Sequence, residues 1–232
     1  MKHGTKKAFR PAMTLTSGEL SALSGSFLMM TATATAKTRR LLQSQVPEVC
    51  KWNNLISPPL RDNVLMIIPP TEILPSNVSV LLAPFAEDMK IHGKTYLIIV
   101  RGINRGCEVY LHLLKYLNSS TLSERQIAFY NRNTSEERKL EILQDLKLPI
   151  RSQSKQYRCV VATVSLGVGV DVRVHNTVVL GLSENVENLL QEAGRSMRGG
   201  AAETGGDRGI SFFLHKGTLG KFIVFSMIIV TL

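Results

Sequence analysis

The feature that most constrains the fold is a series of short runs rich in valine and isoleucine, separated by segments with helical periodicity. The runs expected to form strands are Val64–Ile68, Val78–Leu82, Tyr96–Val100, Ile127–Tyr130, Cys159–Thr163, Thr177–Leu180 and Ile210–Leu214. Strands that are apolar throughout need cover on both faces, and helices between them predict a parallel sheet. We therefore expect an α/β fold with helices on both faces of the sheet, and functional residues beyond the carboxyl ends of the strands.

The segments between these runs include three with the spacing of amphipathic helices. They span residues 105–117, 135–146 and 185–194. Thr134 and Glu137 have the spacing of a capping box at the start of the second helix. The third helix runs into a glycine-rich stretch, residues 199–209.

The net charge of the chain indicates which kind of molecule it binds. Lys and Arg number 28 against 18 for Asp and Glu, which gives a net charge of +10 over 232 residues. A positive charge of this size favours polyanions, either nucleic acid or an anionic membrane surface, although a basic protein can also have no such partner. The apolar run at residues 222–232 is too short for a membrane span, which needs roughly 20 residues.

The cysteines predict neither a metal site nor a disulfide framework. Cys50, Cys107 and Cys159 lie far apart, and no histidine cluster accompanies them. Zinc sites use closely spaced pairs of ligands, so no metal is expected. Widely spaced thiols suit a reducing compartment, the cytosol or the nucleus.

Three segments have compositions that suit phosphate chemistry. Residues 31–35 and 162–165 carry small hydroxyl side chains that can donate hydrogen bonds to a phosphate backbone. Gly167 and Gly169 permit a tight turn before Asp171, which could accept a hydrogen bond from a ribose hydroxyl. In the third segment, Arg195 and Arg198 present two guanidinium groups suited to a phosphoryl group. Each segment alone is also common in turns and on solvated surfaces, so their order in one chain carries the inference.

Taken in order, these segments resemble the RecQ family of ATP-dependent 3′–5′ DNA helicases. The similarity to the family begins with its aromatic-rich loop at residues 8–23 and its motif III at residues 28–35. It continues with motif IV and its helix at residues 97–114 and the segment after it at residues 129–146. It ends with motif V at residues 158–171 and motif VI at residues 191–200. Six matches in the right order are specific, although each alone is weak. The resemblance covers roughly residues 8 to 218.

The sequence also departs from the family pattern. The glycine-rich P-loop of motif I and the D-E-x-H of motif II are absent, and the chain ends before the family's zinc-binding and winged-helix regions. The second glycine of motif VI, Q-x-x-G-R-x-G-R, is Met197 here, and Asn131-Arg132-Asn133 replaces the usual H-A-G. In the aromatic-rich loop only Phe9 is aromatic.

The resemblance implies two RecA-like domains with ATP in the cleft between them. Residues 1–55 correspond to a remnant of the first motor domain, with its aromatic-rich loop and motif III. Residues 60–218 correspond to the helicase C-terminal RecA-like domain, which residues 56–75, rich in proline, link to the first. Residues 219–232 form an apolar tail.

The resemblance also implies a role for particular residues. The catalytic residues would be Arg195, Arg198 and Gln191, and the ATP-binding residues Gly169, Asp171, Arg195 and Arg198. The nucleic-acid-binding residues would be Arg101, Thr163, Ser165, Thr31, Thr33, Phe9 and Arg10. ATP and Mg²⁺ are the implied cofactors, although the P-loop and the Mg²⁺ ligand are absent from these residues.

Three hypotheses follow for function. The first is a helicase, a hydrolase and isomerase of DNA unwinding, recombination and repair in the nucleus, represented by an incomplete chain that is inactive alone. The second is a catalytically dead nucleic-acid-binding module, or one that completes the site of a partner protein bearing the first motor domain. The third is a remnant without function. In the first two, the expected partner is single-stranded or forked DNA, and not a membrane.

Overall fold

The computed structural model divides the chain into two units, Met1–Pro59 and Leu60–Leu232, each considered by itself. The residues that the structure describes are 36, 39, 40, 43, 63–69, 77–118, 126–152, 155–163, 166, 170–181, 183, 186–198 and 208–214. Almost all of them belong to the second unit, and the description below concerns that unit.

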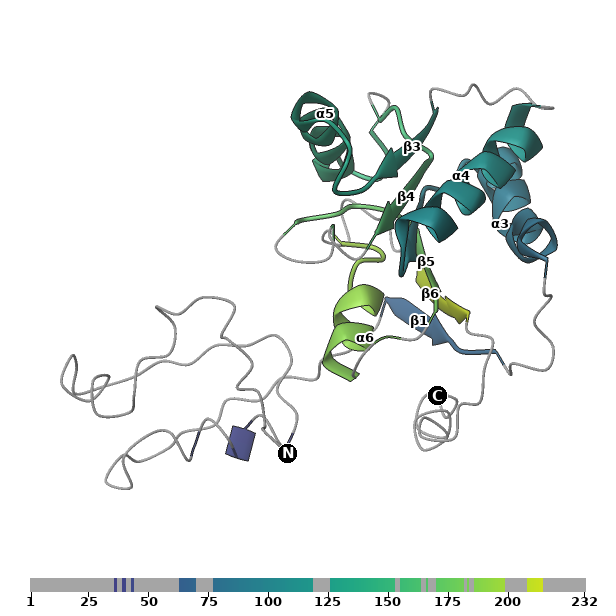
Figure 1. The fold of residues 1–232 in the computed structure, drawn as a ribbon. Helices are drawn as coiled ribbons and strands as arrows, with labels where there is room; N and C mark the ends of the chain where they lie inside the picture. Colours follow the sequence, from purple (N-terminus) through teal and green to yellow (C-terminus); the bar gives the residue numbers. More distant parts are fainter. Residues whose placement is uncertain are drawn as a thin grey trace, which may run out of the picture. The chain divides into compact units, whose positions relative to one another are not determined.

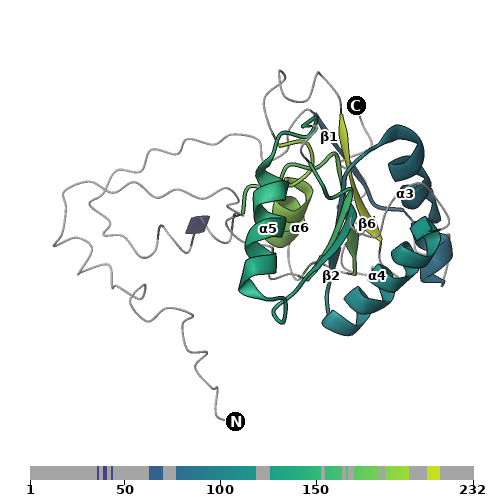
Figure 2. The same ribbon diagram turned by 90° about the horizontal axis from the view of Figure 1, so that it is seen from above.

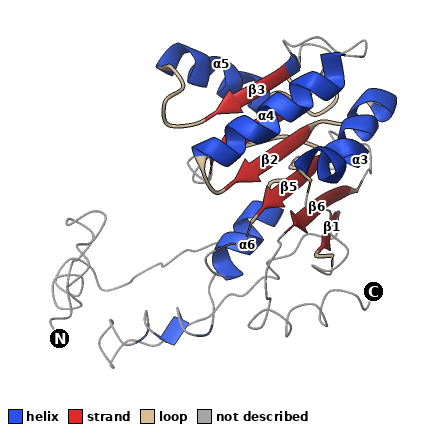
Figure 3. Cartoon of the chain, turned by 45° about the vertical axis from the view of Figure 1, so that its right-hand side comes forward, coloured by secondary structure: helices blue, strands red, loops and turns tan. Residues whose placement is uncertain are grey.

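The described part of the second unit contains a six-stranded sheet whose strands all run parallel (Figures 1 and 3). The strands are β1 (Val64–Ile67), β2 (Tyr96–Val100), β3 (Ile127–Tyr130), β4 (Cys159–Thr163), β5 (Asn176–Leu180) and β6 (Gly209–Leu214). Their order across the sheet is β1-β6-β5-β2-β4-β3. The sheet confirms the predicted α/β class, with all six strands parallel.

Helices cover both faces of the sheet, as the apolar strands predict. Helices α3 (Val78–His92) and α4 (Ile103–Asn118) lie on one face, and α5 (Glu136–Lys147) and α6 (Val186–Ala193) on the other (Figure 2). Alternate side chains of β2 enter the two cores: Ile98 and Val100 pack under α3 and α4, while Leu97 and Ile99 pack under α5 and α6. A strand buried on both faces has no polar side, which explains its continuous apolar run.

Helix α3 corrects one expectation, because residues 78–82 were predicted to form a strand. Asn77 caps the helix by accepting a hydrogen bond from the backbone N–H of Ser79 at 2.8 Å, and Gly93 ends it with φ 61°. The buried residues of the helix follow a helical period: Val78, Leu82, Phe85, Ala86 and Met89. The β-branched Val78 and Val80 suggested a strand only because the window of five residues was too short to show that period.

The start of α5 lies one residue later than the predicted capping box. Ser135 is the cap, and its hydroxyl accepts from the backbone N–H of Arg138 at 3.3 Å. Thr134 instead stabilises the preceding turn, where its hydroxyl accepts from the N–H of Asn131 at 3.0 Å and donates to the carbonyl of Phe129 at 3.3 Å.

The buried phenol of Tyr96 predicts a loss of stability in alkali. Its hydroxyl donates to a carboxylate oxygen of Asp88 at 2.5 Å. Burial, and then this hydrogen bond, raise the pKa of Tyr96 far above its ordinary value of 10.0. The unfolded chain releases this proton near pH 10 and the folded chain retains it, so the free energy of unfolding should fall as the pH rises through 10.

We expect Tyr96→Phe to remove this contribution to the pH dependence. At pH 7 the variant should be less stable by about 1 kcal/mol, the worth of one hydrogen bond, and the deficit should shrink above pH 10. Lys155, whose pKa burial lowers to about 8, acts in the opposite sense between pH 8 and its ordinary value of 10.5. It is present in both proteins and cancels in the difference. Urea unfolding from pH 7 to 11 measures this difference, and a deficit that stays constant would contradict the prediction.

Candidate functional site

Three chain segments meet where strand β2 ends. Arg101 follows β2 directly, Ser183 follows β5, and Glu192 lies in α6. Arg101 donates from Nη1 and Nη2 to the two carboxylate oxygens of Glu192, at 2.7 and 2.9 Å. The Ser183 hydroxyl donates to Glu192 at 2.6 Å and accepts from Arg101 at 2.9 Å. Because the side chain of Glu192 is only 7% exposed, this is a largely buried bidentate ion pair that fastens α6 to the sheet.

A glycine makes room for the arginine of this pair. Gly181 follows β5 with φ 108°, and a Cβ atom there would lie 2.9 Å from Cγ of Arg101. Both the backbone conformation and the space therefore favour glycine. Val100 is in register with Thr163 on one side and with Leu180 on the other, so Arg101 and Thr163 lie at the same carboxyl edge of the sheet.

Arg195 is a buried guanidinium with unused donors. The residue is 3% exposed, and its Nε and Nη1 have no hydrogen-bond partner in the described part of the chain. Burial, and next the nearby Arg198, lower the pKa of Arg195 to about 10, whereas Glu192 acts in the opposite direction. The group is still protonated at neutral pH. Buried donors left unpaired are costly, and they mark a position suited to an anionic ligand.

Arg198 joins the two segments that resemble motifs V and VI. Its Nη1 lies 3.5 Å from Oδ1 of Asp171, and its Nε donates to the carbonyl of Gly194 at 2.9 Å. Nε of Arg173 lies 3.3 Å from Oδ2 of the same aspartate. The expectation that these segments lie side by side is confirmed.

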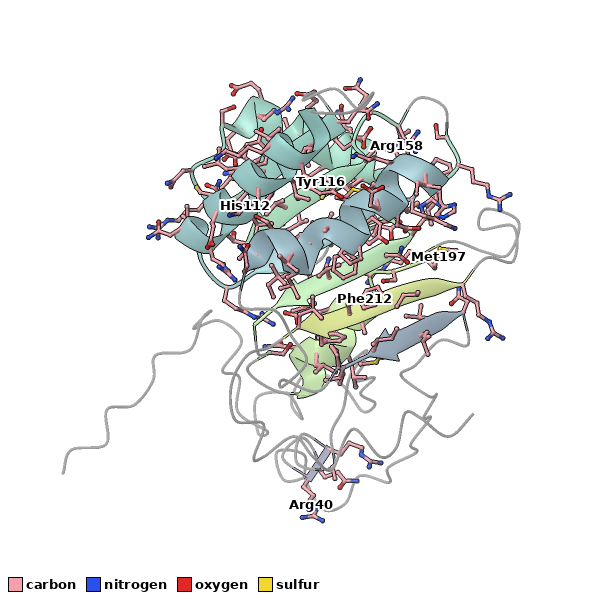
Figure 4. All side chains as sticks on the ribbon, turned by 90° about the vertical axis from the view of Figure 1, so that its right-hand side faces the viewer. Arg40, His112, Tyr116, Arg158, Met197 and Phe212 are labelled. Atoms are coloured by element: carbon pink, nitrogen blue, oxygen red, sulfur yellow. The ribbon has the colours of Figure 1, made fainter. Side chains whose placement is uncertain are left out.

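Their place on the sheet differs from the expectation. Ser196 forms an isolated parallel bridge with Val174, which precedes β5, and the N–H of Met197 donates to the Val174 carbonyl at 2.8 Å. This segment therefore lies near the amino end of β5, and Figure 4 shows Met197 on the same side of the unit as Arg158, which precedes β4. The expectation of a site wholly beyond the carboxyl ends was wrong for this segment, because α6 leads the chain back along the sheet toward the start of the next parallel strand.

Buried hydroxyl groups fix the turn that carries the two arginines. The hydroxyl of Ser196 lies 2.9 Å from that of Thr177 and 2.8 Å from that of Ser211. Ser211 donates to the carbonyl of Ala193 at 3.0 Å. Because these hydroxyls satisfy one another and the end of α6, the turn is tied to β5 and β6.

Met197 has an unusual backbone for its residue type. Its φ is 48°, in the left-handed region, at the position where the RecQ pattern has glycine. The side chain of Met197 is buried, at 1% exposure, and packs against Gly209. A Cβ atom added to Gly209 would lie only 2.2 Å from Cγ of Met197. Gly209 thus provides the space that the methionine occupies.

This backbone reverses the usual order of two substitutions at position 197. Both Met197→Ala and Met197→Gly lose the buried side chain, at a cost of about 2–5 kcal/mol. Alanine also keeps the strain of the left-handed conformation, about 1–2 kcal/mol, which glycine does not have. We expect Met197→Gly to be the more stable variant by about 1 kcal/mol in urea unfolding. A more stable Met197→Ala would show that the backbone at this position relaxes.

The structure places only some of the predicted site residues. The described ones are Arg101, Thr163, Asp171, Gln191, Arg195 and Arg198. Of these, Gln191 is exposed on α6 and Thr163 is half-buried at the end of β4. The remaining ones, Phe9, Arg10, Thr31, Thr33, Ser165 and Gly169, lie outside the described residues, and the predicted roles of all twelve stay predictions.

Two site residues were missed from the sequence. Glu192 and Ser183 bind Arg101, yet neither was singled out. A signal for Glu192 exists, because it lies three residues after Leu189 and directly before Ala193, on the face of α6 that is buried. A carboxylate at an apolar-face position predicts a buried partner.

Residues 93–95 have the last three residues of a P-loop pattern without its context. Gly93-Lys94-Thr95 lies between the end of α3 and the start of β2, whereas a P-loop connects a strand to the following helix. Asp88 stands where the pattern needs its first glycine. The backbone N–H of Thr95 donates to Nδ1 of His175 at 3.0 Å, so it is already used.

The described ranges contain neither a metal site nor a membrane-spanning helix. No three or more His, Cys, Asp and Glu side chains gather there as a metal site would require. None of the helices there combines the length and apolar character needed to cross a membrane.

The sequence matches one known protein family. The helicase conserved C-terminal domain matches residues 77–200, more than half of the chain. A search of curated proteins finds no match.

Several solved structures have a similar fold. The DUF1998 helicase MrfA is 20% identical with a TM-score of 0.54, and the match covers 68% of this chain and 21% of that protein. Cas3 of T. fusca is 19% identical with a TM-score of 0.54, covering 71% and 19%. The helicase Lhr of Mycobacterium smegmatis is 19% identical with a TM-score of 0.50, covering 68% and 20%. The chain thus spans about a fifth of the length of these proteins.

The parallel sheet, the order of the motif-like segments along it and the family match agree with one another. The chain belongs to the helicase conserved C-terminal domain family.

Proposed function

We propose that this chain is the second motor domain of a RecQ-type ATP-dependent 3′–5′ DNA helicase that unwinds DNA in recombination and repair in the nucleus. The observation that carries the proposal is the buried Arg195, which has unpaired donors and lies near Arg198, the residue that pairs with Asp171. The ordered RecQ-like segments support the choice of the RecQ type among helicases.

On the nucleotide side, Arg195 and Arg198 would stabilise the charge of the transferred phosphoryl group of ATP. The unpaired Nε and Nη1 of Arg195 fit an anionic ligand. Asp171 would contact the ribose. MrfA was solved with DNA and AMPPNP, and Lhr with single-stranded DNA and AMP-PNP, which supports a nucleotide here. The described residues do not fit Mg²⁺, because no group of carboxylates gathers among them.

On the DNA side, Arg101 and Thr163 would contact the phosphates of one strand at the carboxyl edge of β2 and β4. The net charge of +10 favours such a partner, and phosphate contacts act on any sequence. The direct test is to titrate labelled single-stranded DNA with the purified chain at two salt concentrations. We expect weak, sequence-independent binding that falls as salt rises, and Arg101→Ala should weaken it equally for all sequences. Absence of binding at low salt, or affinity that salt does not change, would refute the DNA role.

A second candidate is a module that binds nucleic acid without hydrolysing ATP, or that completes the site of a partner protein bearing the first motor domain. The observation that favours it is the lack of a G-x-x-x-x-G-K-[ST] sequence in these 232 residues. Restoration of hydrolysis by a separately supplied first motor domain would support completion in trans, and its failure would favour the binding module.

A further inference from the structure

The pair between Arg101 and Glu192 occupies the side chain to which the proposed function assigns a strand phosphate. Both terminal nitrogens of Arg101 donate to one carboxylate, at 2.7 and 2.9 Å. A phosphate binds a guanidinium through the same two-oxygen geometry. The carboxylate of Glu192 and a strand phosphate therefore compete for the same donors.

Glu192 cannot simply lose this partner. Its side chain is 7% exposed, and a buried carboxylate without a cation is strongly unfavourable. Of the donors in the described part of the chain, Ser183 would remain to it, through the 2.6 Å hydrogen bond. A phosphate at Arg101 therefore binds well only if Glu192 finds another cation.

That second cation is present one helical turn away. Arg195 follows Glu192 by three residues, its backbone N–H donates to the Glu192 carbonyl at 3.3 Å, and the two side chains interact electrostatically. Its buried Nε and Nη1 have no hydrogen-bond partner among the residues described. Arg195 thus holds the free donors that Glu192 would need.

We propose that Glu192 is a gate between Arg101 and Arg195: its carboxylate holds Arg101 when no strand is bound and exchanges to Arg195 when a phosphate of a nucleic-acid strand takes Arg101. The proposal rests on the proposed function, because it takes that phosphate to be the ligand of Arg101. Glu192 acts here as a positioning residue.

The exchange makes the two arginines negatively coupled. An anion bound to Arg195 keeps Glu192 on Arg101 and weakens the hold on the strand. By thermodynamic linkage, a strand bound to Arg101 weakens the binding of the anion to the same degree. In a motor, such coupling would alternate the grip on nucleotide and on DNA.

The test uses Glu192→Gln, because an amide has one acceptor oxygen and no charge to hold the guanidinium. The probe is a labelled thymidine oligonucleotide, titrated with the full 232-residue chain at several salt concentrations. We expect Glu192→Gln to bind it about tenfold more tightly, as one freed charged contact allows. Because Arg101 contacts a phosphate in the bound state of both proteins, the slope of log affinity against log salt should change by much less than about 0.7, the value for one phosphate of a single strand.

A matched control separates the gate from a general change of charge. Glu136→Gln removes the same charge and breaks an ion pair with Lys139, whose atoms lie 2.7 Å apart, on α5. It should give a much smaller gain. Arg101→Gln should abolish the gain from Glu192→Gln, so that the double variant binds like Arg101→Gln alone. Circular dichroism and thermal melting check that each variant folds.

The outcomes separate the gate from the proposed function. If Glu192→Gln binds DNA no more tightly than Glu136→Gln, or if its gain persists without Arg101, the gate is overturned and the DNA role stands. If neither the wild type nor Glu192→Gln binds DNA at low salt, both are overturned. Should Glu192→Gln not fold, Ser183→Ala weakens the hold on Arg101 without changing the charge, and it should give a smaller gain in the same direction; no gain would overturn the gate.

Discussion

Arg195→Met is expected to abolish ATP hydrolysis by a reconstituted motor while leaving the domain folded. The reconstitution combines this chain with a separately supplied first motor domain that bears a P-loop. An arginine that stabilises the transferred phosphoryl group contributes roughly 10³–10⁵ in rate, so the loss should be of that order. Methionine keeps the apolar volume of the buried stem and removes the two unpaired donors, so stability should not fall.

The chain alone should hydrolyse no ATP, with or without DNA. Phosphoryl transfer depends on positioning and on charge stabilisation, and the proposed function assigns only the second to these residues. The control is Arg105→Met on α4, an exposed arginine paired with Glu108, which should leave the reconstituted rate unchanged. Both expectations are checked by measuring the release of phosphate from ATP with and without DNA. DNA-stimulated hydrolysis by the lone chain that Arg195→Met abolishes would show that a positioning element is present after all.

The fold could be predicted where burial on both faces left a clear pattern. Strands β3 and β4 begin and end where the apolar runs predict, because a polar residue precedes each run and the side chains of each strand enter both cores. The error at residues 78–82 has a local cause. Val78 and Val80 are typical of strands, but the cap at Asn77 and the apolar residues as far as Met89 make the segment helical.

The site could be predicted only in part, because sequence motifs name residues and not their partners. The order of the motif-like segments predicted that those carrying Asp171 and Arg198 lie side by side, but it did not predict the ion pair between these two residues. The partner of Arg101 did not follow, since Glu192 lies 91 positions away. No local pattern encodes a contact at that separation. The segment that resembles motif VI also did not predict that Arg195 is buried with unpaired donors. Its burial depends on how the turn after α6 packs.

Met197 and Gly209 show a departure from a family pattern that the packing accommodates. The glycine expected at position 197 is a methionine with φ 48°, and its side chain fills the space above a glycine at the start of β6. Such a pair makes a sharper stability prediction than either residue alone, because the two positions share one volume.

Gly209→Ala is expected to be the most destabilising small substitution in the sheet. A Cβ atom there would lie 2.6 Å from the backbone carbonyl oxygen of His175 and 2.2 Å from Cγ of Met197. The strand cannot easily move away, because the N–H of Gly209 donates to the carbonyl of Asn63 at 2.9 Å and that of Ile210 to the side chain of Asn176 at 2.9 Å. We expect a loss of about 3 kcal/mol in the free energy of unfolding, at the upper end for overpacking.

The matched control is Gly102→Ala, where a Cβ atom would meet nothing within 4 Å. That variant should lie within about 0.5 kcal/mol of the wild type. Adding Met197→Gly to Gly209→Ala removes the contact with the methionine but not the one with the carbonyl of His175. The double variant should therefore be less destabilised than the sum of the two single losses, and urea unfolding of all four proteins measures this coupling. If Gly209→Ala proves as harmless as Gly102→Ala, the start of β6 shifts freely and the shared volume does not constrain the turn that carries Arg195 and Arg198.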